Sequence, residues 1–315
     1  MQYGDILFQR SSETREEVGQ SNVYLDPDRT ATFGGFVIRG RPVVSFDPNF
    51  FHRLLKTDKV RDDMTSRSGG STRYNIGQES LAAVPVHVPT LSEQQKIAEF
   101  LVAVDAKLIA LAAKQAELGR FKAGLMQELL SQHLRFTQDD GQAFPDWDVK
   151  DLGEIAVRCA TKNRGLEHMR VLTNSAVHGV IDQRDYFDKD ISNAENLGGY
   201  YIVRKGDFVY NPRISASAPV GPIKRNDLGD GVMSPLYSVF RFHKQNTDFF
   251  NQFFQTTLWH DYMKSVANYG ARHDRMAITI GDLMGLPLPF PHPNEQAKIA
   301  NVLSAMDAKI QAVAD

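Results

Sequence analysis

The chain has 315 residues, of which 42% are hydrophobic and 23% are charged, and its formal net charge is −2. These values are ordinary for a folded protein of about two domains, and they neither indicate nor exclude a nucleic-acid partner, because binding requires only a local basic patch. The single cysteine, Cys159, excludes an internal disulfide, and no apolar signal region or membrane-length apolar stretch occurs, so we expect a cytoplasmic protein.

In chain order, the sequence predicts a mixed α+β fold of four segments. Residues 1–90 read as β-rich, with a helix near residues 48–57 and a strand in "VPVHVP" just before residue 90. A long helix is expected over residues 91–135, with Ser92 as its N-cap. Residues 136–290 read as β-rich again, with a helix from about Thr247 to Ala267, and residues 291–315 begin a second helix capped by Asn294.

The two helical segments are copies of each other. "EQQKIAEFLVAVDAK" begins at Glu93, and "EQAKIANVLSAMDAK" begins 202 residues later at Glu295, with ten of fifteen positions identical. The same offset relates Gly4 to Gly206 and Pro85 to Pro287, although the sequences between these points scarcely match. Each repeat is therefore predicted to be a variable globular domain followed by a constant helix. In this register, residues 136–290 form a complete domain and residues 1–90 correspond to the C-terminal part of another.

Apolar residues recur at alternating steps of four and three along both helices. This spacing is typical of a coiled-coil seam, which requires a partner helix, whereas the alternative is an amphipathic helix packed on its own domain. The predicted residues for helix pairing and subunit docking are Ile97, Leu101, Val104, Leu108, Leu111, Leu118, Leu125 and Leu129 in the first copy and Ile299, Leu303, Met306 and Ile310 in the second.

Basic residues gather in loops that also contain Gly, Ser and Asn. Arginine can pair with guanine, asparagine with adenine, and lysine with phosphate, so such loops suit DNA, although solvated surface loops are the alternative. The predicted DNA-binding residues are Arg158, Lys162, Arg164, Arg170, Asn211, Arg213, Lys224, Arg225, Lys264, Arg272, His273 and Arg275, with Arg67 and Arg73 in the first repeat.

Motifs for catalysis are absent from the sequence. Neither GxxxxGK[ST] nor GxGxxG occurs, no two histidines are four residues apart, and no cysteine pair exists. "PDWDVK" places its acidic residues too close together for a nuclease site, and "YNPRI" lacks the second proline and the aromatic residue of an adenine-N6 methyltransferase loop. We therefore predict neither catalytic residues nor a metal site.

With these features together, the chain resembles the DNA-specificity (S) subunits of type I restriction–modification systems. The resemblance rests on the duplicated helix motif, on "FPDWDVKDLGEIA" as the opening of a target recognition domain, on "KGDFVYN" as its central strand, and on "RMAITIGDLMGLPLPFP" as its closing segment. It implies that each recognition domain reads one half of a bipartite double-stranded DNA site, that long helices join the domains, and that modification subunits dock on this frame.

The resemblance also implies a non-catalytic role. The chain itself would bind no cofactor, whereas the modification subunits would use S-adenosylmethionine to methylate adenine-N6, and a restriction subunit would add ATP- and Mg²⁺-dependent cleavage. Relative to two full repeats, which need 404 residues at an offset of 202, the chain resembles a protein shortened at both ends. We therefore expect a fragment, a shortened gene product, or a half completed by a second copy or another chain. The alternative function is a scaffold or regulator that binds modification subunits through the long helix without reading DNA.

Overall fold

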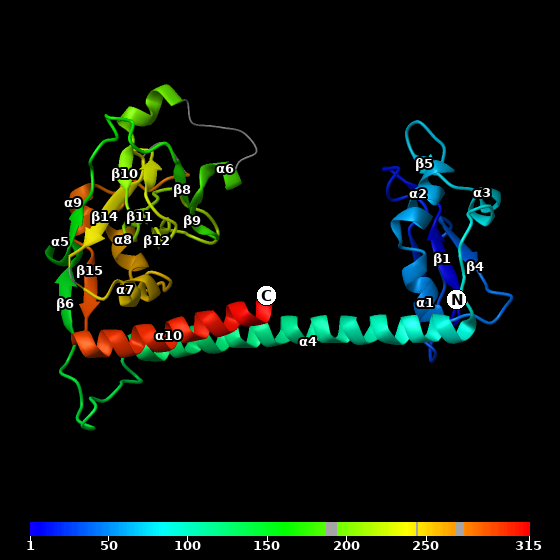
Figure 1. Cartoon of the computed structure of the whole chain (residues 1–315), viewed down its shortest axis with the longest axis horizontal. Helices are drawn as coiled ribbons and strands as arrows, with labels where there is room; N and C mark the ends of the chain where they lie inside the picture. The colour runs from blue at the N-terminus through cyan, green and yellow to red at the C-terminus, as the bar shows by residue number, and fades with distance from the viewer. Residues whose placement is uncertain (187–193, 244, 269–273) are drawn as a thin grey trace. The chain divides into compact units, whose positions relative to one another are not determined.

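The computed structural model describes residues 1–186, 194–243, 245–268 and 274–315. The chain divides into two compact units, unit 1 (residues 1–113) and unit 2 (residues 114–315), and each is described by itself (Figure 1). Within the described ranges, no helix combines the length and the apolar character that a membrane crossing needs. The α+β class with long helices is confirmed.

Unit 1 is built on a small antiparallel sheet in the order β3–β1–β4. These strands are β1 (Ile6–Gln9), β3 (Ser21–Val23) and β4 (Val37–Gly40). The remaining elements before the long helix are β2 (Ser11–Ser12), which pairs with β5 (Tyr74–Asn75), and the helices α1 (Pro48–Leu54), α2 (Asp58–Ser66) and α3 (Gln78–Ala82). Ile6 and Phe8 pack with Met64 and Ile76 in one apolar core, whereas Leu7 on the opposite face of β1 stays half-buried.

Unit 2 has a four-stranded antiparallel sheet in the order β12–β11–β14–β7. Its strands are β7 (Ala156–Arg158), β11 (Phe208–Tyr210), β12 (Ile223–Arg225) and β14 (Ser238–Phe242). Three two-stranded ladders surround this sheet: β6 (Asp148–Asp151) with β15 (Pro287–Phe290), β8 (Leu172–Ser175) with β9 (Gly179–Asp182), and β10 (Tyr201–Val203) with β13 (Gly231–Met233). The helices are α5 (Leu152–Ile155), α6 (Gln183–Tyr186), the 3-10 helix η1 (Ala194–Gly199), α7 (Thr247–Phe253), α8 (His260–Val266) and α9 (Ile280–Met284).

An aromatic core joins one face of the unit 2 sheet to the helices. Phe242 stacks on Phe250 of α7 with ring centroids 4.4 Å apart, and Phe208 stacks on Phe240 at 5.7 Å. Full burial of one such ring contributes about 1.5–3 kcal/mol, so these contacts fix α7 against the sheet. On the opposite face, Val209 belongs to a smaller apolar cluster that also includes residues of β8 and β9.

The 202-residue offset relates the two units element by element. It carries β1, β3 and β4 onto β11, β12 and β14, α2 onto α8, and α3 onto α9, with matching ends for α3 and α9. A buried carboxylate that pairs with an arginine repeats as well, although the arginines are not equivalent, since Arg241 corresponds to Arg39 in the 202-residue offset. Asp5 accepts from Arg41 Nε at 2.7 Å and Nη2 at 2.8 Å, and Asp207 accepts from Arg241 Nε at 2.5 Å and Nη2 at 2.9 Å.

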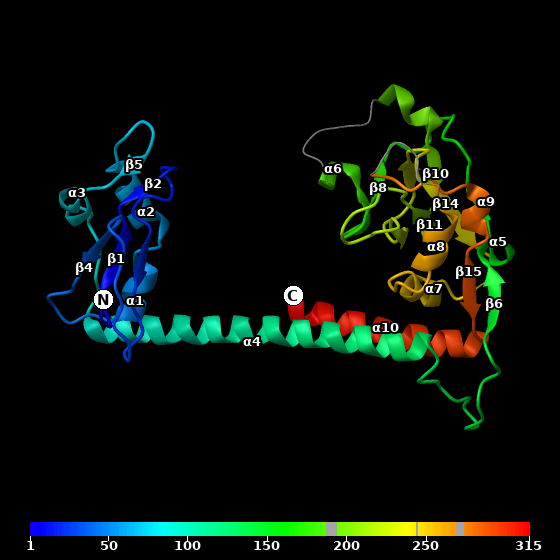
Figure 2. The same cartoon turned by 180° about the vertical axis from the view of Figure 1, so that it is seen from behind.

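The two constant helices are α4 (Leu91–Leu130) and α10 (Pro293–Ala314). Within unit 2, the C-terminal part of α4 runs antiparallel beside α10 (Figures 1 and 2), and Lys122 Nζ donates to Asp307 Oδ1 at 2.6 Å. The predicted seam residues are more buried in unit 2 than in unit 1. In unit 2 the buried ones are Leu129, Ile299 and Leu303, and the half-buried ones are Leu118, Leu125, Met306 and Ile310. In unit 1 the half-buried ones are Leu101 and Leu111, and the exposed ones are Ile97, Val104 and Leu108.

Three local predictions about the helices are wrong. The first long helix ends at Leu130 rather than at residue 135, because Gln132 adopts a left-handed conformation with φ of 64° and the Leu134 amide bonds back to Glu128. The helices also begin earlier than predicted, since Thr90 caps α4 and His292 caps α10. The single helix expected from Thr247 to Ala267 is two helices, α7 and α8, because Trp259 turns into the core against Phe254 between them.

The strand predicted in "VPVHVP" does not form. Its counterpart in the second repeat is β15, which pairs with β6 of the same unit. Unit 1, all of whose residues are described, has no strand in the place of β6, so residues 85–88 have no ladder partner there. A strand needs a neighbour for its backbone groups, and the same sequence pattern therefore gives a strand only in unit 2.

Candidate nucleic-acid interface

A polar cavity of about 590 Å³ opens in unit 2 where several connecting loops meet. Strand β8 and its turn form one wall, the loop after β11 forms another, and the segment between β13 and β14 closes it. The polar side chains that line it include Thr173, Asn174, Ser175, Asn211, Arg213, Ser215, Ser217, Ser234, Tyr237 and Arg275. Of the predicted DNA-binding residues, the cavity thus brings together Asn211, Arg213 and Arg275.

The loop after β11 is shaped by its sequence "NPRISASAPVG". Ser215 and Ala218 bond to each other in both directions, with N···O distances of 3.1 Å, which closes a tight turn. Gly221 has φ of +78°, and a Cβ there would lie 2.1 Å from the carbonyl oxygen of Asn211. Only glycine allows this return of the chain toward β12, so the turn presents Arg213 and its neighbours at the cavity.

Two asparagines hold the cavity wall in place. Asn211 Nδ2 donates to the carbonyl of Asn174 at 2.9 Å, and its Oδ1 accepts from the Arg213 amide at 3.0 Å. The buried Asn174 in turn donates to the carbonyl of Val209 at 2.7 Å. Asn211 therefore anchors the loop, and its predicted contact with a base remains a prediction.

Arg213 and Arg275 make the cavity rim positive. Their backbones pair in an isolated antiparallel bridge, and both guanidinium groups lie near the single carboxylate of Asp274, at 4.0 Å and 3.7 Å. Two cations around one anion leave a net positive charge. The Arg213 side chain is 62% exposed, so most of its N–H donors can reach a ligand.

Three of the predicted DNA-binding cations form ion pairs within unit 2, and a fourth lies on a strand. Arg225 is 17% exposed and pairs with Asp227 and Asp248. Arg170 pairs with Asp182 at 3.0 Å, and Lys264 pairs with Asp261 at 3.3 Å. Lys224 lies on β12 rather than in a loop. Burial, together with the nearby charge of Lys122, lowers the pKa of Lys224, whose side chain is half-buried.

The other predicted residues lie outside this cavity. Arg158 reaches the hydroxyl of Tyr201 at 3.5 Å, Lys162 pairs with Tyr201 through the backbone, and Arg164 is exposed in the turn that follows. In unit 1, Arg67 is exposed after α2, and Arg73 lies 3.5 Å from Glu13. Arg272 and His273 lie outside the described residues.

Sequence reasoning missed the wall formed by β8. Thr173 shares a hydrogen bond of 2.9 Å with the Tyr237 hydroxyl, and Ser175 Oγ accepts from the backbone of the β8–β9 turn. The signal in the sequence was "TNS", three polar residues at the end of an apolar run, which is unusual for a strand buried along its whole length. No basic residue marks this wall, so a search for positive charge passed over it.

Chemically, the cavity offers hydrogen-bond donors and acceptors. Arginine N–H groups, hydroxyls and an amide can bind phosphate oxygens and base edges. Among residues 1–186, 194–243, 245–268 and 274–315, no group of three or more His, Cys, Asp or Glu side chains could hold a metal ion.

Comparison with known proteins gives a consistent picture. Residues 19–119 match the family model of the type I restriction modification DNA specificity domain. The chain is 24% identical to the putative type I restriction enzyme MjaX specificity subunit of Methanocaldococcus jannaschii, over 98% of this chain and 72% of that protein. It is 27% identical to the StySPI specificity subunit of Salmonella potsdam, over 49% of this chain and 34% of that protein.

The fold is similar to that of a solved structure. The HsdS subunit from Thermoanaerobacter tengcongensis superposes with a TM-score of 0.53 at 18% identity, over 99% of this chain and 75% of that one. The duplicated helix, the repeated sheet and these matches lead to one conclusion: the chain is similar to the specificity subunits of type I restriction–modification systems.

Proposed function

We propose that this chain is a non-catalytic specificity subunit that reads one part of a bipartite DNA site through the cavity of unit 2. The observation that carries the proposal is the pair Arg213 and Arg275, which share one carboxylate and form a positive rim. Guanidinium groups in this setting can contact the backbone phosphates and pair with guanine in the major groove. The surrounding hydroxyls add donors and acceptors that can distinguish bases.

In the same proposal, the exposed part of α4 docks modification subunits. Phe100, Leu108 and Ile109 are 68%, 59% and 70% exposed, and an isolated helix rarely presents so much apolar surface without a partner. The modification subunits would use S-adenosylmethionine, and a restriction subunit would use ATP and Mg²⁺, whereas this chain would bind no cofactor. The work of the complex would be methylation or cleavage at the site that this chain selects.

The same exposed helix favours a second candidate function. A scaffold that binds modification subunits through α4 would need this apolar surface but not the positive cavity rim. Such a protein would act as a regulator or competitor of a DNA-reading subunit. The two functions make opposite predictions about Arg213 and Arg275.

The test is selection of DNA from a random duplex pool by the complex of this chain with its modification subunits. The expected result is an enriched half-site motif. Changing both Arg213 and Arg275 to alanine should weaken binding to the selected DNA by at least about tenfold and lower the slope of log affinity against log salt by up to about 1.8. The matched control changes Lys114 and Arg120 on α4 to alanine, which removes the same charge elsewhere.

The outcomes separate the functions. A half-site motif that is lost in the double Arg variant and kept in the control supports DNA reading by the cavity. Assembly with modification subunits without any enriched motif contradicts DNA reading and supports the scaffold. Selective binding that is unchanged in the double variant would place the reading surface elsewhere.

A further inference from the structure

Two aliphatic side chains lie exposed at the lip of the unit 2 cavity. Val177 is 73% exposed and Leu236 is 56% exposed, and both line the cavity whose rim carries Arg213 and Arg275. Turns usually carry glycine or small polar residues, so a large aliphatic side chain in each of two turns is unusual. Exposed aliphatic residues that occur singly need no explanation, but two at one cavity with a positive rim form a surface of mixed chemistry.

Val177 lies in the turn between β8 and β9. The two strands pair up to Ser175 and Gly179, and Gly179 closes the turn with φ of +71°. Ser175 Oγ accepts from the amides of Val177 and His178 at 3.3 Å and 3.2 Å. The backbone of the turn is therefore held by hydrogen bonds to a serine, and the Val177 side chain is left outside the core.

Leu236 lies in a turn that is built in a similar way between β13 and β14. Pro235 follows Ser234, and the Tyr237 amide donates to the Ser234 carbonyl at 3.0 Å, which is the hydrogen bond of a β-turn with proline at its favoured position. Ser234 Oγ also accepts from the Leu236 amide at 3.4 Å. This turn, too, forms without burying its aliphatic side chain.

A hydrogen bond joins the supports of the two turns. Thr173 of β8 and the Tyr237 hydroxyl share a bond of 2.9 Å, and both residues line the cavity. Thr173 lies on the strand that leads to the turn of Val177, and Tyr237 directly follows Leu236. The two turns therefore belong to one wall, and their aliphatic side chains belong to one lip.

The charge of the cavity indicates which ligand can contact this lip. Within the described part of the chain, the charged residues that line the cavity are Arg213 and Arg275, and none of the lining residues is acidic. Such a lining favours a polyanion such as DNA. The apolar group that the major groove of unmodified DNA exposes is the C5-methyl group of thymine.

We propose that Val177 and Leu236 each contact the C5-methyl group of a thymine in the DNA half-site. The inference rests on the proposed function, because it requires DNA at the cavity of unit 2. The arginines of the rim contact phosphate or guanine, and the aliphatic lip selects thymine at neighbouring positions, because cytosine has no methyl group there.

The experiment replaces each thymine of the selected half-site by deoxyuridine, which removes the methyl group and keeps the base pairing. Fluorescence anisotropy measures the affinity of each duplex for the complex of this chain with its modification subunits. The expected result is a loss of about threefold to fivefold at two positions of the half-site, which is the effect of one buried methyl group. A selected half-site without thymine on either strand, or equal affinity for the deoxyuridine duplexes and the unmodified duplex, overturns the inference.

Two variants assign the positions to the side chains. Leu236→Ala should bind the unmodified duplex about threefold to fivefold more weakly and should no longer distinguish thymine from deoxyuridine at one of the two positions, and Val177→Ala should lose the distinction at the other. The matched control is Leu258→Ala, because Leu258 is also 56% exposed in unit 2 but does not line the cavity, and it should leave all affinities unchanged. A deoxyuridine effect that persists in both variants would arise from the deformability of the DNA and would contradict the inference.

The outcomes also separate this inference from the proposed function. Absence of any enriched motif contradicts the proposed function and the inference with it. A motif that is lost in the double variant of Arg213 and Arg275, without any distinction between thymine and deoxyuridine, supports the proposed function and overturns the inference alone. Urea denaturation followed by tryptophan fluorescence checks that Val177→Ala and Leu236→Ala leave the stability of unit 2 unchanged.

Discussion

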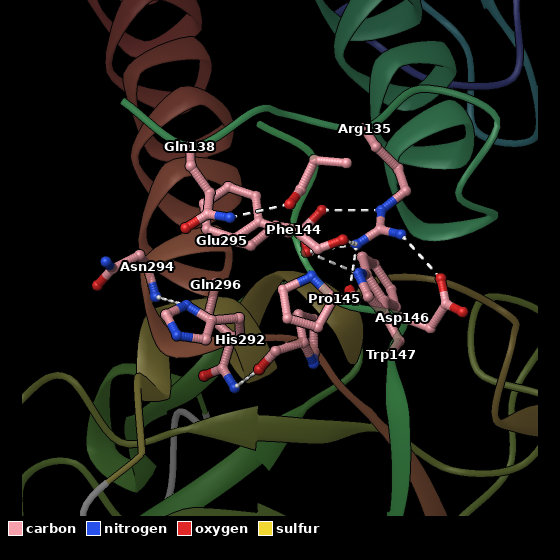
Figure 3. Close-up of polar contacts among 12 residues, drawn as sticks. Arg135, Gln138, Phe144, Pro145, Asp146, Trp147, His292, Asn294, Glu295 and Gln296 are labelled. Atoms are coloured by element: carbon pink, nitrogen blue, oxygen red, sulfur yellow. Dashed lines mark hydrogen bonds and ion pairs between the residues drawn. The ribbon is translucent and has the colours of Figure 1, made fainter. Parts of the chain in front are cut away.

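Units 1 and 2 contain the same three central strands, a buried aspartate at the same position and the same helix motif, yet one glutamate of that motif is exposed in unit 1 and buried in unit 2. Glu93 has no side-chain partner within its unit, whereas Glu295 binds Arg135 and Trp147 (Figure 3). The motif is therefore not a self-sufficient structural unit. The helix start forms in both units without such a partner, whereas the glutamate carboxylate gains hydrogen-bond partners only where another segment packs against the helix.

The repeated aspartate of the motif shows a milder difference. Asp105 pairs with Arg53 of α1 at 2.7 Å, and Asp307 pairs with Lys122 of α4 and with Gln252 of α7. In both units this carboxylate therefore links the constant helix to the helix that follows the central strands, which is α1 in unit 1 and α7 in unit 2. In unit 2 it also neutralises an ammonium that the neighbouring helix buries.

The largest expected effect is on stability after replacement of the two glutamates. Glu295→Gln leaves Arg135 without its main partner and should lower the free energy of unfolding of unit 2 by about 2–3 kcal/mol, somewhat less than for a fully buried pair because Arg135 is 23% exposed. Glu93→Gln should change stability by less than about 0.5 kcal/mol. Both tryptophans, Trp147 and Trp259, lie in unit 2, so urea denaturation followed by tryptophan fluorescence reports this unit. Little or no loss of stability in Glu295→Gln would contradict the assigned role of the ion pair.

A smaller difference is expected for the aspartates. Asp307→Asn leaves the buried Lys122 ammonium with a single side-chain acceptor, Gln255, and should cost unit 2 about 1–2 kcal/mol. Asp105→Asn removes an ion pair between two partly exposed side chains and should cost about 0.5 kcal/mol or less. Hydrogen exchange of peptides from each unit measures both values. A larger loss in Asp105→Asn than in Asp307→Asn would refute this ranking.

A further effect is confined to acidic pH and to unit 1. Hydrogen bonding to Arg41 lowers the pKa of Asp5 from 3.8 to about 2, although burial opposes the shift. Because the folded-state pKa is depressed, this carboxylate stabilises unit 1 above its unfolded pKa of about 3.9, and the contribution is lost as the pH falls toward about 2. Carbon-13 NMR of the Asp5 carboxyl group measures its titration directly. In Arg41→Gln the pKa should rise, and a wild-type titration near the ordinary value would show that the pair does not form in solution.

Much of the architecture could be predicted from the repeat alone. The offset between Glu93 and Glu295 correctly related the region of β1, after Gly4, to that of β11, after Gly206, and the "KGDFVYN" segment forms the central strand β11. Individual helices and strands were predicted wrongly where tertiary contacts, rather than the local sequence pattern, determined the secondary structure. Trp259 turns into the core and divides a predicted helix, and residues 85–88 stay unpaired although the same pattern forms β15.

The candidate site was predicted only in part. The search for arginine in loops of Gly, Ser and Asn selected Arg213 and Arg275 separately, and the fold brings them to one cavity although they are 62 positions apart in the sequence. The same rule also selected Arg225 and Lys224, which the fold uses internally, because sequence does not show which acidic residues lie next to a cation. The polar wall of β8 carried no charge and was missed.

By itself, the sequence determined the duplication, the constant helices and the resemblance to type I specificity subunits, because periodic apolar residues and a repeated motif are properties of the linear chain. Only the tertiary structure decided which charges are free and which are paired, since ion pairs such as Arg135 with Glu295 join residues far apart in the chain. It also decided that two copies of one motif have different surroundings. A carboxylate is buried where the fold brings a guanidinium and an indole to it, and it stays in water where the fold does not.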